Sequence, residues 1–185
     1  MEFNKSVSNP MLMGCMELLR AEDTPEHRNM FIVELQKANF LAPALIIPAP
    51  EEDGEGNLRL HPRSQVQFPM LVSTEGQKYF MGFTDEAEYR LWVEKNRPLP
   101  TFAVKFDDFV RMLMDKDPQG NPCAAMGFVV NPYGVNFVVH KDMIANIMAD
   151  RMMQTFTKKD GRNVQKLRVR KTSNTAGESK GDLQE

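Results

Sequence analysis

The sequence is poor in the residues that form covalent or metal cross-links. It contains two cysteines, Cys15 and Cys123, and three histidines among 185 residues. Two distant cysteines outside any C-x-x-C motif do not make a disulfide framework, so we expect a reduced, cytoplasmic compartment. His27, His61 and His140 are not at ligand spacing from one another or from a cysteine. The sequence therefore predicts no metal site.

Long apolar runs and the common catalytic motifs are also missing. No stretch approaches the ~18 apolar residues of a membrane span, and the N-terminal letters MEFNKSVSNP do not follow the order of a signal peptide. The G-x-G-x-x-G, P-loop, G-x-S-x-G and H-E-x-x-H motifs do not occur. We therefore expect no enzymatic activity, no catalytic residues, no cofactor and no membrane partner.

What the chain does contain is a globular composition with an uneven charge distribution. Hydrophobic residues make up 42% and charged residues 26%, which is enough apolar material for a core. The formal net charge of -2 combines a balance of -6 over residues 1–153 with +4 over residues 154–185. The sequence thus predicts an acidic folded body followed by a basic tail.

Periodicity and turn residues predict alternating helices and strands. Thr24 before Pro25 is typical of a helix N-cap, and Thr84 before an acidic turn is typical of another. The expected helices begin near residues 10, 25, 85, 107 and 141, and the expected strands cover 39–50, 68–72, 78–83, 101–106, 126–130 and 135–139. Residues 51–65 are polar and predict an exposed connection.

Two of these strand pairs are predicted hairpins, which makes the sheet largely antiparallel. We expect an α+β fold of one domain, with a mixed sheet packed by about four helices. Residues 24–153 form this domain, residues 1–23 are an N-terminal extension with a short helix, and residues 154–185 are a flexible, mostly disordered basic tail.

The second hairpin, GFVVNPYGVNFVV (127–139), contains the most patterned turn of the chain. Asn131, Pro132 and Gly134 are the residue types that a type I turn favours at its first, second and fourth positions. A left-handed Gly134 would then give a three-residue hairpin with a bulge. In the alternative interpretation, exposed Asn131 and Tyr133 side chains bind a partner. Turn chemistry accounts for the whole string, so we favour the structural interpretation.

Four segments in a fixed order carry a family resemblance: FLAPALIIP, FPMLVSTEGQKYFMGFTDEAEYRLW, VKFDDFVRMLM and MGFVVNPYGVNFVV. Together they resemble the N-terminal domain of the SseB family, named for enhanced serine sensitivity, over roughly residues 25 to 150. The resemblance implies a small bacterial cytoplasmic module. It brings no catalytic motif that could be assigned to residues of this chain.

Two functional hypotheses remain open. The first is a protein-interaction module with an unknown protein partner, and its candidate contact residues are Asn131, Tyr133, Met152 and Met153. The second is binding of nucleic acid or another anionic surface through the tail, residues 158–171. Its candidate residues are Lys158, Lys159, Arg162, Lys166, Arg168, Arg170 and Lys171. No aromatic residue follows Phe156 to stack on a base, so we favour the first hypothesis.

Overall fold

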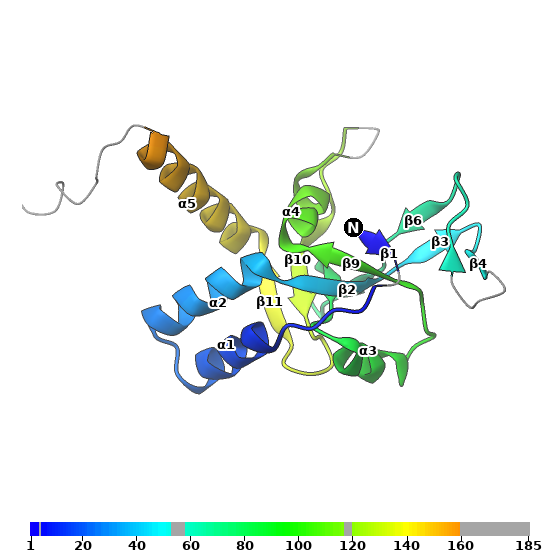
Figure 1. Ribbon diagram of the computed structural model, residues 1–185, viewed down its shortest axis with the longest axis horizontal. Helices are drawn as coiled ribbons and strands as arrows, with labels where there is room; N and C mark the ends of the chain where they lie inside the picture. The colour runs from blue at the N-terminus through cyan, green and yellow to red at the C-terminus, as the bar shows by residue number, and fades with distance from the viewer. Residues whose placement is uncertain (4, 53–57, 117–119, 160–185) are drawn as a thin grey trace, which may run out of the picture. The chain divides into compact units, whose positions relative to one another are not determined.

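The computed structural model describes residues 1–3, 5–52, 58–116 and 120–159, which divide between two compact units, the first Met1–Ile147 and the second beginning at Met148. The described helices are α1 (Pro10–Ala21), α2 (Pro25–Lys37), α3 (Glu86–Val93), α4 (Phe106–Met114) and α5 (Lys141–Lys159) (Figure 1). The described strands are β1 (Glu2–Phe3), β2 (Asn39–Pro43), β3 (Leu45–Ile47), β4 (Glu51–Glu52), β5 (Leu58–Arg59), β6 (Gln65–Gln67), β7 (Met70–Val72), β8 (Lys78–Gly82), β9 (Thr101–Lys105), β10 (Ala125–Val130) and β11 (Phe137–His140).

The strands of the first unit form two main sheets. One sheet has the order β11-β10-β8-β7, in which β8 and β10 are parallel and the two outer pairs are antiparallel. The other has the order β1-β9-β2 and is antiparallel throughout. Two backbone hydrogen bonds between Leu41 and Phe83, of 2.8 and 2.9 Å, connect the two sheets. The fold is therefore α+β with a mixed, largely antiparallel sheet, as predicted.

Both predicted hairpins are present. The pairs β7–β8 and β10–β11 are antiparallel ladders, and Gly76 between β7 and β8 has a φ of 80°, a conformation that glycine adopts without steric cost. The polar connection expected over residues 51–65 contains short pairings that we did not predict, because β4 pairs with β5 and β6 pairs with β3. The strand expected over 39–50 is divided into β2 and β3.

An aromatic core holds α4 against the strands. Phe109 of α4 stacks on Phe128 of β10 with ring centroids 4.3 Å apart and planes 5° apart. Phe40 of β2 meets both rings edge-on at 5.9 and 5.8 Å. All three side chains are fully buried. Because edge-to-face and offset aromatic pairs add to the energy of apolar burial, this cluster fixes the position of α4.

The helix starts agree with the sequence in one case and differ in another. The Thr24 hydroxyl accepts a hydrogen bond of 3.1 Å from the His27 backbone N–H, so Thr24 is the N-cap of α2. The cap of α3 is Asp85, whose carboxylate accepts from the Glu88 N–H at 3.0 Å. The prediction that Thr84 caps α3 is therefore wrong by one residue.

Candidate binding pocket beside the first two helices

The Asn131-Pro132-Tyr133-Gly134 segment is a turn, as predicted. The Gly134 N–H donates to the Asn131 carbonyl at 3.0 Å, and the Asn136 N–H donates to the same oxygen at 2.8 Å. The left-handed residues are Asn131, with φ 50°, and Asn136, with φ 53°. The prediction that Gly134 takes this conformation is wrong. Asparagine tolerates the left-handed region better than most residues, which explains both positions.

The Asn131 side chain is a buried structural group. It is 0% exposed, and its Oδ1 accepts from the Thr84 backbone N–H at 2.9 Å. Its Nδ2 donates to the Thr84 hydroxyl at 2.8 Å and to the Met13 sulfur at 3.2 Å. The interpretation in which Asn131 is an exposed contact residue therefore needs correction, since no surface of this side chain reaches solvent.

A second asparagine, Asn9, binds the backbone carbonyl of Thr84, whereas Asn131 binds its backbone N–H. The Asn9 Nδ2 donates to the Thr84 carbonyl at 2.7 Å and to the Asn39 carbonyl at 2.6 Å, and its Oδ1 accepts from the Asn39 N–H at 3.2 Å. These bonds connect the start of α1 to the start of β2 and to the end of β8. The side chains of Asn9 and Asn131 thus form hydrogen bonds that hold distant segments of the fold together.

The other candidate contact residues lie in different environments. Tyr133 is 37% exposed, with the Lys95 ammonium 5.3 Å from its ring centroid and the Asn96 amide 3.4 Å from its hydroxyl. Met152 and Met153 are 59% and 65% exposed and belong to the second unit. Asn131 and Tyr133 share one turn, yet their side chains contact different elements.

Five of the seven basic residues of the tail hypothesis fall outside the described part of the chain. Lys158 and Lys159 are the last two residues of α5. Arg162, Lys166, Arg168, Arg170 and Lys171 lie outside the described residues. Of the flexible tail predicted over residues 154–185, the structure describes only 154–159, which are the end of α5, and the rest of that prediction lies outside the described residues.

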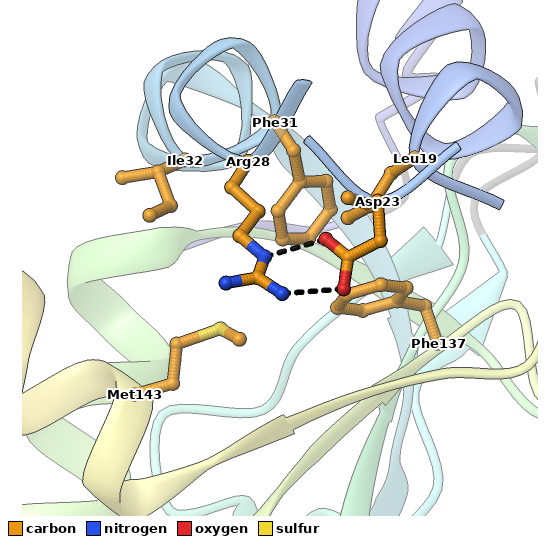
Figure 2. A pocket seen from close by; sticks show the side chains of 7 residues that line it. All are labelled: Leu19, Asp23, Arg28, Phe31, Ile32, Phe137 and Met143. Carbon is orange, nitrogen blue, oxygen red and sulfur yellow. Dashed lines mark hydrogen bonds and ion pairs between the residues drawn. The ribbon is translucent and has the colours of Figure 1, made fainter. Parts of the chain in front are cut away.

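The first unit contains an apolar pocket that the sequence did not predict. The pocket has a volume of about 360 Å³ and is lined by Leu19, Asp23, Arg28, Phe31, Ile32, Phe137 and Met143 (Figure 2). The lining residues come from α1, the connection to α2, α2 itself, β11 and the first turn of α5. A volume of this size is within the range of pockets that take small ligands or large side chains of a partner.

Local sequence explains how the helices present these residues. Leu12, Cys15 and Met16 are buried and mark the inner face of α1, and Leu19 extends that face by one turn. Leu19 is half-buried, because one side of it packs in line with this inner face and the other lines the pocket. On α2, Phe31 and Leu35 are the buried residues, while the neighbouring Ile32 is partly exposed.

The floor of the pocket is aromatic. Phe31 is fully buried, and its ring centroid lies 4.3 Å from that of Phe137, with the ring planes tilted by 44°. Phe137 is half-buried, so part of its ring faces the pocket. An apolar group that entered the pocket would replace water on the exposed part of the Phe137 ring and gain the corresponding transfer free energy.

One ion pair lies at the rim of the pocket. The Arg28 Nε donates to the Asp23 Oδ1 at 2.5 Å and Nη2 donates to Oδ2 at 2.5 Å, which is a bidentate arrangement (Figure 2). The hydrogen bond from Arg28 lowers the pKa of Asp23 and the same bond raises the pKa of Arg28. The two side chains are 56% and 60% exposed, so both remain accessible to a ligand.

A second apolar hollow runs along α1. It has a volume of about 500 Å³, and its lining includes Met11, Gly14, Leu18 and Ala21 of α1 and Met30 of α2. Met11, Leu18 and Met30 are 65%, 43% and 45% exposed. The helices α1 and α2 lie side by side (Figure 1). This helix pair therefore presents apolar material at two hollows.

A weak signal for this surface exists in the sequence. The apolar stripe of α2 is wider than the two buried residues Phe31 and Leu35 require, because Ile32 and Val33 follow directly. Val33 is 47% exposed. An apolar stripe that exceeds the buried face indicates exposed apolar surface, but it does not say which segment lies opposite.

Clustered metal ligands and membrane-spanning helices are both missing from the described residues. Over that part of the chain, no group of three or more His, Cys, Asp and Glu side chains converges as a metal would require. Within the same ranges, no helix combines the length and the apolar character needed to span a bilayer.

Comparison with known proteins adds one match. Residues 12–146 match the family model described as the SseB protein N-terminal domain. All seven pocket residues fall inside this range, as do Asn131 and Thr84. A search of curated proteins and a search of solved structures each returned no match.

Proposed function

The chain belongs to the SseB family, and we propose that it is a protein-interaction module that binds a partner protein through the surface of α1 and α2. In this proposal the protein catalyses no reaction and acts in the cytoplasm of a bacterial cell. Two free cysteines, one buried and one half-buried, are consistent with a reducing compartment.

The observation that carries the proposal is the pocket of Figure 2. An apolar pocket with an aromatic floor and a polar rim is the arrangement of protein interfaces, where large side chains enter desolvated pockets. The neighbouring hollow along α1 extends the apolar surface and contains exposed methionines. Methionine side chains adapt to partners of different shape.

Binding of nucleic acid or another anionic surface through residues 158–171 is the second candidate. It is favoured by seven basic residues against one acidic residue, Asp160, in that segment. Such a segment would neutralise phosphates, so its binding would weaken steeply with salt. A protein–protein contact through an apolar pocket would depend much less on salt.

Capture from the native cell separates the two candidates. The tagged chain is recovered with and without nuclease, at low and high salt, and with a second chain that ends at Thr155. A defined protein partner that survives nuclease, high salt and truncation supports the interaction module. Recovery that is lost under any of these conditions transfers the function to the basic tail.

Matched variants test the surface itself. Leu19→Glu places a charge at the pocket and Leu18→Glu places one in the hollow along α1. Leu91→Glu on α3 is the control, since Leu91 is an exposed helical leucine outside both hollows. We expect partner recovery to fall about tenfold or more for a surface variant, as for a central interface residue. Equal recovery of all three variants would place the interface elsewhere.

A further inference from the structure

We propose that the pocket of Figure 2 binds a large aromatic side chain of a partner polypeptide together with the backbone N–H and C=O of the same residue. The peptide N–H donates to Asp23, and a peptide carbonyl accepts from Arg28. This inference rests on the proposed function, because it names the chemistry that the same site recognises.

The apolar lining selects the side chain. Phe31 and Phe137 form a tilted aromatic pair on the floor, and Leu19, Ile32 and Met143 contribute aliphatic and thioether groups around it. An aromatic ring can meet Phe137 edge-on and the Met143 sulfur at its own edge, and both contacts are favourable geometries. The volume of about 360 Å³ accommodates one large ring with part of the attached backbone.

The rim pair selects the polar group. Arg28 has five N–H donors, and the bidentate pair with Asp23 uses two of them. Figure 2 shows the third guanidinium nitrogen turned away from Asp23. Each Asp23 oxygen keeps a lone pair beyond the one that Arg28 occupies. The rim therefore offers at least one donor and one acceptor on the same ion pair, which suits the N–H and C=O of one extended residue because those two groups point the same way.

Charge complementarity favours a neutral group over an ion. Asp23 and Arg28 neutralise one another, so the rim has no net charge. A ligand carboxylate would compete with Asp23 for the guanidinium, and a ligand ammonium would compete with Arg28 for the carboxylate. The N–H and C=O of one residue can bond to both without breaking the pair. We therefore expect an amide to bind about tenfold more tightly than either ion.

Three small probes with the same indole ring test this directly on the 185-residue chain. They are N-acetyl-L-tryptophan amide, which is neutral, N-acetyl-L-tryptophan, which is anionic, and L-tryptophan amide, which is cationic. Two-dimensional NMR of the ¹⁵N-labelled protein follows each titration. We expect the neutral probe to shift the amide signals of residues 19, 28, 32, 137 and 143, with a Kd of roughly 1 mM for a ligand of this size.

Charge-removing variants make the test specific for the rim pair. Asp23→Asn leaves Arg28 without its counter-ion, so the preferred probe should change from the amide to the anion. Arg28→Gln should change it to the cation. Glu34→Gln is the control, because Glu34 pairs with Lys37 on the same helix and does not line this pocket. The exposed position of Asp23 and Arg28 lets both variants keep the fold, which the dispersion of the NMR spectrum verifies.

Each outcome decides the inference. The inference is supported if the neutral probe binds most tightly and shifts only signals at the pocket. It also requires the preferred probe to change in Asp23→Asn and in Arg28→Gln. No localised shift up to roughly 10 mM, equal affinity for the three probes, or an unchanged preference in both variants overturns it. The proposed function is judged separately by partner recovery with Leu19→Glu. Loss of recovery without probe binding would keep the interaction module and reject this recognition chemistry.

Discussion

The Asn131 side chain satisfies both the backbone N–H and the hydroxyl of Thr84, at 2.9 and 2.8 Å, although the two residues are 47 positions apart. This contact joins the turn between β10 and β11 to the residue that precedes the cap of α3. Both residues are 0% exposed, so water could not take the place of either hydrogen bond if it were removed. The contact explains why an asparagine stands at the start of this turn.

Removing the Asn131 side chain should destabilise the protein strongly. Asn131→Ala leaves the buried Thr84 N–H without an acceptor and places alanine at a φ of 50°. A buried unsatisfied group costs about 1–3 kcal/mol, and a left-handed alanine adds about 1 kcal/mol. We expect the free energy of unfolding, measured by urea denaturation, to fall by about 2–4 kcal/mol.

Asn136→Ala is the matched control for this prediction. Asn136 has a φ of 53° and is exposed, so its replacement tests the backbone conformation separately from buried hydrogen bonds. We expect a loss of about 1 kcal/mol. Equal losses for the two variants would show that the turn conformation, and not the contact with Thr84, is what Asn131 provides.

Tyr89 ties α3 to the chain that follows it, and Tyr89→Phe should weaken that connection. The Tyr89 hydroxyl donates to the Leu99 carbonyl at 2.6 Å and accepts from the Leu99 N–H at 3.0 Å. We expect a loss of about 1–2 kcal/mol in the free energy of unfolding. Tyr79→Phe is the control, since that hydroxyl bonds to the side chain of Gln77 and should cost less. A larger effect at Tyr79 would contradict the prediction.

The sequence predicts local features of this fold well because their causes are local. The Thr24 cap, the Gly76 turn and the Asn131 turn each follow from the preferences of a few adjacent residues. The two hairpins follow from such turns between apolar segments. Where a distant contact competes, the prediction fails. Thr84 has the right side chain for a cap, but Asn131 already binds its hydroxyl, and Asp85 takes the role.

The candidate site could not be predicted in the same way. Its pocket combines Leu19, Arg28, Phe137 and Met143, which come from four elements, and their convergence depends on packing that the pattern of one sequence does not determine. Within the sequence, Asn131 and Tyr133 are marked by unusual local patterning. For Asn131 this patterning reflects a structural role, because its side chain is buried and hydrogen-bonded to Thr84.

Gly127 allows the close approach of β10 to β11, and a side chain there should disrupt the hairpin. A Cβ at Gly127 would lie 2.1 Å from the backbone oxygen of Val139, which cannot move independently of its strand. We expect Gly127→Ala to lower the free energy of unfolding by about 3 kcal/mol or more. Thermal denaturation followed by circular dichroism measures the loss.

Gly14→Ala is the control for adding the same methyl group. A Cβ at Gly14 meets no heavy atom within 4 Å, and the residue lies inside α1. Alanine favours a helix interior over glycine by about 0.5–1 kcal/mol, so this variant should be more stable than the wild type. A loss of stability in Gly14→Ala would mean that the added methyl group collides with the lining of the hollow along α1.

Glu88 should make stability depend on pH. Burial, and to a smaller extent the negative charge of Asp85, raises the pKa of Glu88 above its usual value of 4.5. Its Oε2 is buried without a hydrogen-bond partner among the described residues. Gly134 lies against this carboxylate, because a Cβ there would be 2.2 Å from Oε2. The folded protein therefore holds the Glu88 proton more tightly than the unfolded chain does.

The sign of the effect follows from this difference in proton binding. A raised folded-state pKa stabilises the protein fully below the unfolded value near 4.5, and this stabilisation is lost as the pH rises through the folded value. Glu88→Gln stays neutral at every pH, so its advantage over the wild type should grow from about pH 4 to pH 7 and reach roughly 1 kcal/mol or less. Urea denaturation at several pH values measures it, with Glu94→Gln as the background for removing a negative charge next to α3. A Glu88→Gln advantage that does not change with pH, after subtraction of this background, would show that the carboxylate is solvated in the folded protein.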